Sequence, residues 1–492
     1  MYFPLAIIFM TEKEKGDNDN FMAETQRNPI WRVKPVDLIL KQGNEGEHSL
    51  KRTLGPLSIT AMGIGAIVGT GIFVLTGVAA AKYAGPGLIL SFIVAGIASG
   101  LAAICYAEFA STVPISGSAY TYSYATLGEL IAWIIGWDLI LEYAVGAAAV
   151  SIGWSGYFTD FLKSLFGITI PKALIASPFS GGIVNLPAML IILLITVLLV
   201  IGTSESSGFN NIMVGIKLLV ILFFIVVGAF HVHTMNWQPF LPFGVGGVFS
   251  GASIIFFAYI GFDQISTSAE EARNPSKDLP IGIILSLTIC TLLYILVTAV
   301  LTGMVSYKQL DVSSPVSHAL ILVGLNTAGS IISVGAICGL TTVLLVLLYG
   351  QSRIFFSMAR DGLLPAFFSH VHPRFKTPYL SSILIGVVVA LVAGLTPIDI
   401  VAELTNIGTL TAFVLVSAAV LILRRTQPDL RRGFRVPWVP VIPILSILAS
   451  LILIVSLPLV TILRFIIWLV LGLIVYFLYS RHASKLEKNY AD

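Results

Sequence analysis

Charged side chains are scarce in this chain: Asp, Glu, Lys and Arg make up 11% of its 492 residues, less than half of their share in soluble domains. The formal net charge is only +3, which gives no reason to expect nucleic acid as a partner. The three cysteines all fall within apolar stretches, so they indicate neither a disulfide framework nor a redox role. The seven histidines approach one another only at i, i+2 spacing, which does not place two ligands on one helix face, so no metal site is expected.

Apolar residues, by contrast, make up 57% of the chain, and the mean hydropathy is +0.94. This composition is typical of an integral membrane protein. Long runs of Leu, Ile, Val, Gly and Ala without strict alternation predict helices rather than a β-barrel. The runs long enough to span a bilayer cover residues 56–83, 87–113, 127–158, 183–202, 207–230, 243–268, 279–305, 329–357, 378–395, 399–423, 438–458 and 460–480. We therefore expect an all-α integral membrane protein with twelve transmembrane helices.

The basic residues predict the orientation of these helices. With the amino terminus inside, cytoplasmic segments hold 22 Lys or Arg residues and external segments hold five, so both termini are expected in the cytoplasm of a multi-pass protein of the cell membrane. Residues 1–50 and 481–492 form cytoplasmic tails. Within the first tail, Val36 to Leu40 favour a short amphipathic helix on the inner membrane surface. Met10 and Met22 are alternative first residues.

Two of the apolar runs contain residues that loosen a helix at mid-membrane depth. The first reads GIGAIVGTGIF over Gly63–Phe73, and the second reads IIFFAYIGFD over Ile254–Asp263. Each opens a group of five runs, which is typical of an inverted-repeat transporter with discontinuous helices. Freed amides after the first break suit a carboxylate and freed carbonyls before it suit an ammonium group, and an α-amino acid carries both. The alternatives are a small-residue packing face made by Gly65 and Gly69, and simple core packing of the aromatic residues in the second run.

Lys217 lies in the middle of the apolar run IMVGIKLLVILFF, where a lysine costs about 2.5 to 3.5 kcal/mol to insert. Loss of water disfavours the charged amine, so this lysine either exchanges a proton near neutral pH or stays charged beside an acid such as Glu142. Glu142 and Asp138 lie four residues apart on the third run, hence on one helix face. Either suits a proton site, a partner for Lys217 or a binder of a cationic substrate side chain. Glu108 and Glu403 lie near the ends of their runs, which is typical of interfacial carboxylates.

Four motifs make the chain resemble the cationic amino acid transporter family of the amino acid-polyamine-organocation superfamily, especially its bacterial proton-coupled members. They are GIGAIVGTGIF, YAEFASTVPISGSAYTYSYATLGE (Tyr106 to Glu129), FFAYIGFDQISTSAEEARNPSKDLPIGI (Phe256 to Ile283) and LYGQSRIFFSMARDGLLP (Leu348 to Pro365). The resemblance runs over essentially the whole chain after about Lys51. It implies a five-plus-five inverted-repeat core with discontinuous helices one and six, followed by two extra helices. The implied bounds are 51–424 for the core, about 56–231 and 243–424 for its two repeats, and 437–480 for helices eleven and twelve.

The resemblance also implies which residues bind the substrate. Its carboxylate would meet the amides of Thr70 and Gly71. Its ammonium group would meet the carbonyls of Ile67, Phe257, Ala258 and Ile260. Leu347 on helix eight is apolar, at a position where a small residue would admit a long cationic side chain. This favours small or medium neutral L-amino acids as substrates. Glu142 leaves cationic substrates open as well.

Proton coupling is implied by the same resemblance, because Lys217 stands where proton-coupled members carry a helix-five lysine in place of a sodium ion. Its implied neighbours are the carbonyls of Gly65 and Val68 and the hydroxyls of Thr341 or Thr342. The proton would then be the coupling ion, and no cofactor or metal is expected.

Other functions fit this sequence less well than that of a transporter. An exchanger of cationic amino acids or polyamines with the same fold is the alternative. An enzyme is not expected, since the sequence has neither a nucleophile with its base nor an HExxH motif at membrane depth. A channel would present rings of repeated charge or carbonyls, and the glycines at positions 63 and 65 follow no strand that would make them a nucleotide loop. The expected partners are an amino acid and membrane lipid, with a small accessory membrane helix left open along with the oligomeric state.

Overall fold

The computed structural model describes residues 32–33, 54–112, 118–202, 207–263, 265, 272–375, 377–429 and 432–486. The amphipathic helix expected at Val36 to Leu40, the alternative first residues Met10 and Met22, and residues 487–492 of the second tail lie outside the described residues.

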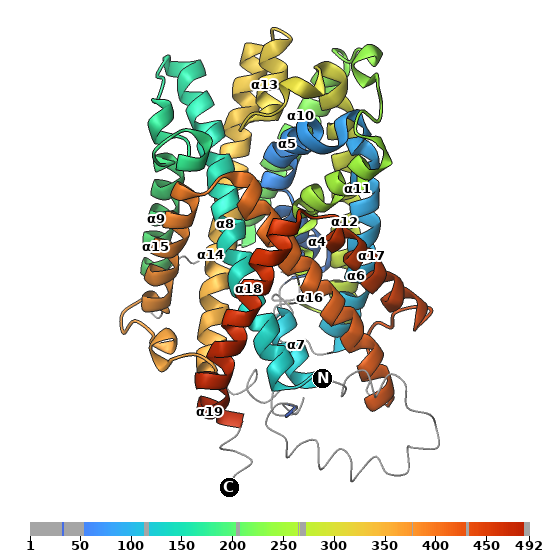
Figure 1. The fold of residues 1–492 in the computed structure, drawn as a ribbon, viewed down its shortest axis with the longest axis vertical. Helices are drawn as coiled ribbons and strands as arrows, with labels where there is room; N and C mark the ends of the chain where they lie inside the picture. Colours follow the sequence, from blue (N-terminus) through green and yellow to red (C-terminus); the bar gives the residue numbers. More distant parts are fainter. Residues whose placement is uncertain are drawn as a thin grey trace.

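Helices and short helical turns make up most of the described chain (Figure 1), which confirms the all-α prediction. The longer helices are α4 (Pro56–Ile67), α6 (Leu88–Thr112), α7 (Ser118–Thr126), α8 (Glu129–Phe166), α9 (Leu186–Ile201), α10 (Ser207–Ala229), α11 (Gly244–Ile255), α12 (Pro275–Met304), α13 (Pro315–Leu322), α14 (Asn326–Arg360), α15 (Tyr379–Leu395), α16 (Ile398–Thr426), α17 (Val441–Val455) and α18 (Leu459–Val475). The shorter pieces that matter below are η2 (Gly71–Leu75), α5 (Thr76–Ala79), η3 (Ala80–Ala84), η8 (Phe256–Tyr259), η12 (Tyr476–Ser480) and α19 (Arg481–Ala483).

Within the described residues, seven helical segments are long and apolar enough to cross a membrane, and five shorter apolar helices accompany them. Most helices lie close to the apolar runs of the sequence, with two larger differences. α8 continues to Phe166 instead of ending near residue 158, and α11 ends at Ile255, with η8 following to Tyr259, although its run was expected to reach residue 268. Gly167 ends it with a φ of +67°, a left-handed conformation that glycine adopts without strain. The start of α9 is fixed by Asn185, whose side chain accepts the Ala188 N–H at 3.3 Å.

Two apolar helices are interrupted, and both interruptions lie in the motifs described above. After α4 the backbone of Val68 is extended, with a ψ of 100°, and helical structure resumes in η2. After α11 the short turn η8 leads to an extended Ile260 and then to Gly261, whose φ of +117° requires glycine. The backbone groups freed at these two places therefore need partners outside their own helices.

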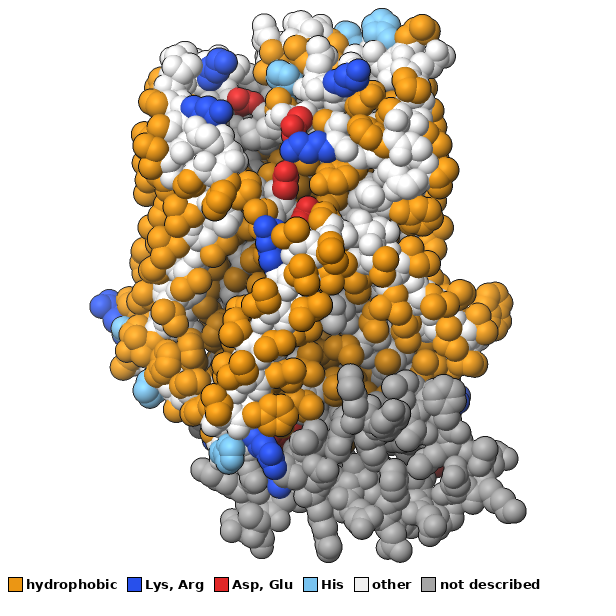
Figure 2. Space-filling view, in the orientation of Figure 1, with side chains coloured by type: hydrophobic (Ala, Val, Ile, Leu, Met, Phe, Trp, Pro, Cys, Tyr) orange, Lys and Arg blue, Asp and Glu red, His pale blue; other side chains and the backbone are white. Residues whose placement is uncertain are grey.

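The long helices run side by side between two ends of the molecule, with α7 and α19 at one end and α13 at the other (Figure 1). α8 packs against both α14 and α16, while α12 packs against α4 and α6. In Figure 2 the flank of the molecule is covered largely by hydrophobic side chains. Such a surface is unfavourable in water and suits contact with lipid.

The last long helix, α18, is fastened to α8 by tryptophans. Trp133 donates its indole N–H to the Gly472 carbonyl at 2.9 Å, and Trp137 donates to the Trp468 carbonyl at 2.9 Å. Trp468 returns a bond to the Trp137 carbonyl at 3.2 Å, and the rings of Trp137 and Trp468 stack with centroids 4.5 Å apart. The side chains of α8 thus hold α18 by both polar and stacking contacts.

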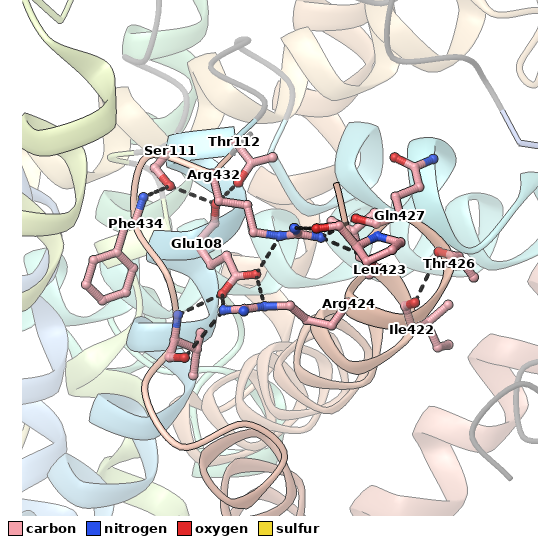
Figure 3. A network of polar contacts seen from close by, with 12 residues as sticks. Glu108, Ser111, Thr112, Ile422, Leu423, Arg424, Thr426, Gln427, Arg432 and Phe434 are labelled. Carbon is pink, nitrogen blue, oxygen red and sulfur yellow. Dashed lines mark hydrogen bonds and ion pairs between the residues drawn. The ribbon is translucent and has the colours of Figure 1, made fainter. Parts of the chain in front are cut away.

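Glu108, near the end of α6, forms a polar network with the end of α16 and the segment before α17 (Figure 3). Its carboxylate accepts hydrogen bonds from Arg424 at 2.6 and 2.8 Å and from the Val436 N–H at 2.7 Å, and it pairs with Arg432 at 3.2 Å. Arg432 also donates to carbonyls at the end of α16. The network ties two helices that lie more than 300 residues apart in sequence.

Glu108 and Glu403 are the two carboxylates expected at the membrane interface. Both lie near helix ends, yet they are only 1% and 6% exposed. Partners from distant segments cover them: the two arginines cover Glu108, and the Thr461 hydroxyl of α18 donates to Glu403.

We expect Glu108→Gln to lower the thermal stability of the purified protein. Removing one partner of a buried ion pair leaves the other charge uncompensated, at a cost of about 3 kcal/mol or more. The melting temperature of Glu108→Gln in detergent should fall by several degrees. Asp429→Asn changes an exposed carboxylate just after α16 and should melt like the wild type. Equal melting of all three proteins would contradict a stabilising role for the network.

Candidate functional site

The two interrupted helices meet at a cavity in the middle of the helix bundle. The first contributes Ala66, Ile67, Gly69, Thr70 and Gly71, and the second contributes Phe257 and Ile260. The segments approach each other closely, since a Cβ atom at Gly71 would lie 2.2 Å from the Ala258 Cα. Glycine at this position is therefore what allows the two breaks to face one cavity.

Three long helices complete the walls of the cavity. α8 provides Glu142, Gly146 and Val150, α14 provides Val343 and Leu347, and α16 provides Thr405. The walls are thus mostly apolar, with backbone polar groups and a few hydroxyls or carboxyls. This is the usual make-up of a site for a small organic molecule.

Six of the seven residues expected to bind substrate line this cavity, namely Ile67, Thr70, Gly71, Phe257, Ile260 and Leu347. The seventh, Ala258, packs its backbone against Gly71 and is not among the lining residues. Thr70 is fully buried, and its hydroxyl oxygen has no hydrogen-bond partner among the described residues. Because a buried hydroxyl without a partner is costly, this oxygen is well suited to bind a ligand in the cavity.

Lys217 is 1% exposed, and its amine donates a hydrogen bond to the Gly65 carbonyl at 2.8 Å. Gly65 belongs to the last turn of α4, where the carbonyls lack partners within the helix. A charged or polar donor from α10 therefore supports the helix immediately before its break. A Cβ atom on Gly339 of α14 would lie 3.1 Å from the Lys217 side chain, so α14 also covers it closely.

The threonine hydroxyls implied as neighbours of Lys217 have hydrogen bonds to other groups. The hydroxyl of Thr341 donates to the Ile337 carbonyl and accepts from the Trp154 indole, and that of Thr342 donates to the Gly339 carbonyl. In this conformation, Gly65 is thus the implied neighbour that the structure joins to Lys217 by a hydrogen bond.

Glu142 and Asp138 share one face of α8 but have different surroundings. Glu142 lines the cavity, whereas Asp138 is fully buried beside Gly408 of α16, and neither of its carboxylate oxygens has a hydrogen-bond partner among the described residues. Across the described part of the chain, no ion pair joins Lys217 to either acid. The interpretation of Lys217 as a permanent partner of Glu142 therefore has no support in this geometry.

Several residues of the site were missed in the sequence. Gly146 and Val150 follow Glu142 at four-residue steps on α8, and Val343 precedes Leu347 by the same step on α14. Helical periodicity from the two predicted positions would have found them. Tyr294 of α12, whose hydroxyl donates to the Ile67 carbonyl at 3.0 Å, carries no such signal, because a buried tyrosine in an apolar helix resembles ordinary core packing.

Comparison with known families fits this arrangement. The family model described as amino acid permease matches residues 54–480, which is most of the chain. The chain belongs to the amino acid permease family. The names of the family and of its members indicate a transporter of amino acids across a membrane rather than an enzyme.

Two proteins of Bacillus subtilis (strain 168) are similar to this permease over nearly its full length. It is 55% identical to the branched-chain amino acid permease BcaP, over 94% of this chain and 100% of the relative, and 52% identical to the methylthioribose transporter, over 93% and 99%. The vacuolar cationic amino acid transporter 4 of Arabidopsis thaliana is 40% identical over 82% of this chain and 68% of the relative. The vacuolar cationic relative is thus less similar to this chain than the two Bacillus subtilis proteins are.

Proposed function

We propose that this permease imports small or medium neutral L-amino acids together with protons, and that Lys217 is the coupling site. The observation that carries the proposal is the hydrogen bond from the buried Lys217 amine to the Gly65 carbonyl, one turn before the break that lines the cavity. A protonated amine there supports the freed carbonyls of α4. Loss of the proton removes the positive charge that faces these carbonyls. The interaction that stabilises the end of α4 at the first break therefore differs between the two protonation states of Lys217.

The substrate is bound mainly through its amino acid backbone in this proposal. Amides that follow the first break, at Thr70 and Gly71, receive the carboxylate, and the Thr70 hydroxyl adds a donor. Carbonyls at Ile67, Phe257 and Ile260 receive the ammonium group. These groups contact only the α-carboxylate and the α-ammonium group, which all amino acids share. The substrate side chain is therefore selected by the rest of the cavity.

Neutral side chains are favoured by the apolar part of the walls, formed by Val150, Val343 and Leu347. The branched-chain name of a relative that is 55% identical supports the same choice. Apolar walls bind aliphatic side chains by removing them from water and leave a charged side chain without its hydration.

The membrane arrangement belongs to the same proposal. Seven long and five shorter apolar helices in the described chain would make twelve crossings, with two five-helix repeats of opposite orientation at about 56–231 and 243–424 and two extra helices at 437–480. The excess of Lys and Arg in the segments expected inside would place both termini in the cytoplasm.

A second candidate is exchange of cationic amino acids or polyamines without a proton in the cycle. The observation that favours it is Glu142, a carboxylic acid in the cavity wall with no ion-pair partner among the described residues. A cationic side chain that reaches Glu142 would supply that partner.

Purified protein in proteoliposomes distinguishes these candidates. We expect an outside-acid pH gradient to drive accumulation of L-isoleucine, L-valine or L-alanine, and lysine, arginine and putrescine to compete at least tenfold more weakly in a screen at two pH values. Methylthioribose belongs in the screen because one relative is named for it. Counterflow of cationic substrates that does not depend on pH would contradict the proposal and favour the second candidate.

A further inference from the structure

Tyr294 lies in the middle of α12, fully buried, and reaches the first break from outside the cavity. Its hydroxyl donates to the Ile67 carbonyl at 3.0 Å. Ile67 is the last residue of α4, and it lines the cavity. A carbonyl at the end of a helix has no partner within that helix, so a donor from another helix can satisfy it and stabilise its direction.

The aromatic ring of Tyr294 touches the second break as well. It packs edge-to-face on Tyr259 of η8, with ring centroids 5.7 Å apart, and against Phe92 of α6 at 5.5 Å. Tyr259 in turn donates its hydroxyl to the Phe92 carbonyl at 2.7 Å. One side chain of α12 therefore contacts the interrupted part of both helices that form the cavity.

Tyr294 also stands beside the proposed coupling site. Cys290, one turn earlier on α12, is also fully buried, and α12 packs against both α10 and α4. Lys217 and Tyr294 donate to two carbonyls of the same helical turn, at Gly65 and Ile67. The free end of α4 is thus held by two side-chain donors, one from α10 and one from α12.

We infer that Tyr294 is a positioning residue for substrate binding: its hydroxyl fixes the direction of the Ile67 carbonyl, and its ring packs against Tyr259 of the second break. The inference rests on the proposed function, because it requires an amino acid to bind between the breaks. A carbonyl oxygen has two lone pairs. The Tyr294 hydroxyl uses one of them, and the other is left, in a fixed direction, for the ammonium group of the substrate.

Removing only the hydroxyl tests this role. We expect Tyr294→Phe to raise the KM for L-isoleucine uptake about three- to tenfold, the range that corresponds to one hydrogen bond, and to change the maximal rate less than twofold. Replacing Tyr294 by 4-aminophenylalanine restores a donor at the same place and should bring the KM back toward the wild-type value. A hydroxyl that served only packing would give no such rescue.

Tyr476→Phe is the matched control. Tyr476 is also fully buried and donates its hydroxyl to Glu129, far from the cavity. We expect this variant to keep the wild-type KM. An unchanged KM in Tyr294→Phe, or an equal rise in both variants, would overturn the inference.

Hydrogen–deuterium exchange without any substrate separates this inference from the proposed function. In Tyr294→Phe, amides in a peptide covering residues 64–75 should exchange at least threefold faster than in the wild type, because the end of α4 has lost a support. Wild-type protein that binds no amino acid would contradict the proposed function, and the exchange result would then decide on Tyr294 alone. Unchanged exchange at this peptide would overturn the positioning role.

Discussion

Proteoliposomes that contain Lys217→Ala are expected not to concentrate L-isoleucine on an outside-acid pH gradient. With one proton per substrate, a gradient of one pH unit supports about tenfold accumulation, and the variant should stop at equal concentrations inside and outside. The physical reason is local. Alanine removes both the donor to the Gly65 carbonyl and the one basic group that faces the end of α4 from α10. The measurement is radiolabelled uptake to steady state at several gradients.

Two controls make this result specific to coupling. Counterflow of L-isoleucine without a pH gradient should persist in Lys217→Ala, which shows that the cavity is still formed. Lys172→Ala removes an exposed lysine and should accumulate substrate like the wild type. Accumulation by Lys217→Ala that equals the wild type at every gradient would show that Lys217 does not couple proton and substrate movement.

Gly71→Ala is expected to weaken substrate binding strongly. The added Cβ would lie 2.2 Å from the Ala258 Cα and 2.7 Å from the Ala258 nitrogen, and backbone atoms cannot rotate away as a flexible side chain can. The two breaks must move apart, and the cost of such overpacking, about 3 kcal/mol, corresponds to a loss of about 100-fold in affinity. The measurement is the Kd of L-isoleucine for the purified protein in detergent.

Gly246→Ala is the matched control, because a Cβ at Gly246 of α11 meets no atom within 4 Å. This variant should bind with the wild-type Kd and elute as the same species in size-exclusion chromatography. Wild-type affinity in Gly71→Ala would show that the crossing of the two breaks does not shape the cavity.

Local chemistry explains what could be predicted from the sequence. The break after α4 is predictable because Gly69 and Gly71 loosen the helix in an apolar run. Lipid cannot satisfy the backbone groups that such a loosening exposes, so the break has to face protein, a cavity or a ligand. Lys217 was conspicuous because a lone basic residue in an apolar run carries a large insertion cost. Leu347 was placed in the cavity by resemblance, and the structure brings it there.

Contacts between distant segments explain the rest. Glu108 is buried because Arg424 and Arg432 cover it, and neither helix shows in its own sequence that the other will lie there. Tyr294 meets Ile67 across 227 residues of sequence, and the apolar pattern around it fits a core tyrosine equally well. Helical periodicity fixes which residues share a face, but it does not reveal which face of another helix that surface will meet.

The tryptophan contacts between α18 and α8 have a consequence for the surrounding lipid. The side chains of Trp133 and Trp137 tie α18 to the same helix that places Glu142 in the cavity wall. The two helices cannot slide past each other without breaking three hydrogen bonds and a ring stack. We therefore expect α8 and α18 to tilt as one unit, so that lipid packed around α18 also bears on the cavity wall that α8 provides.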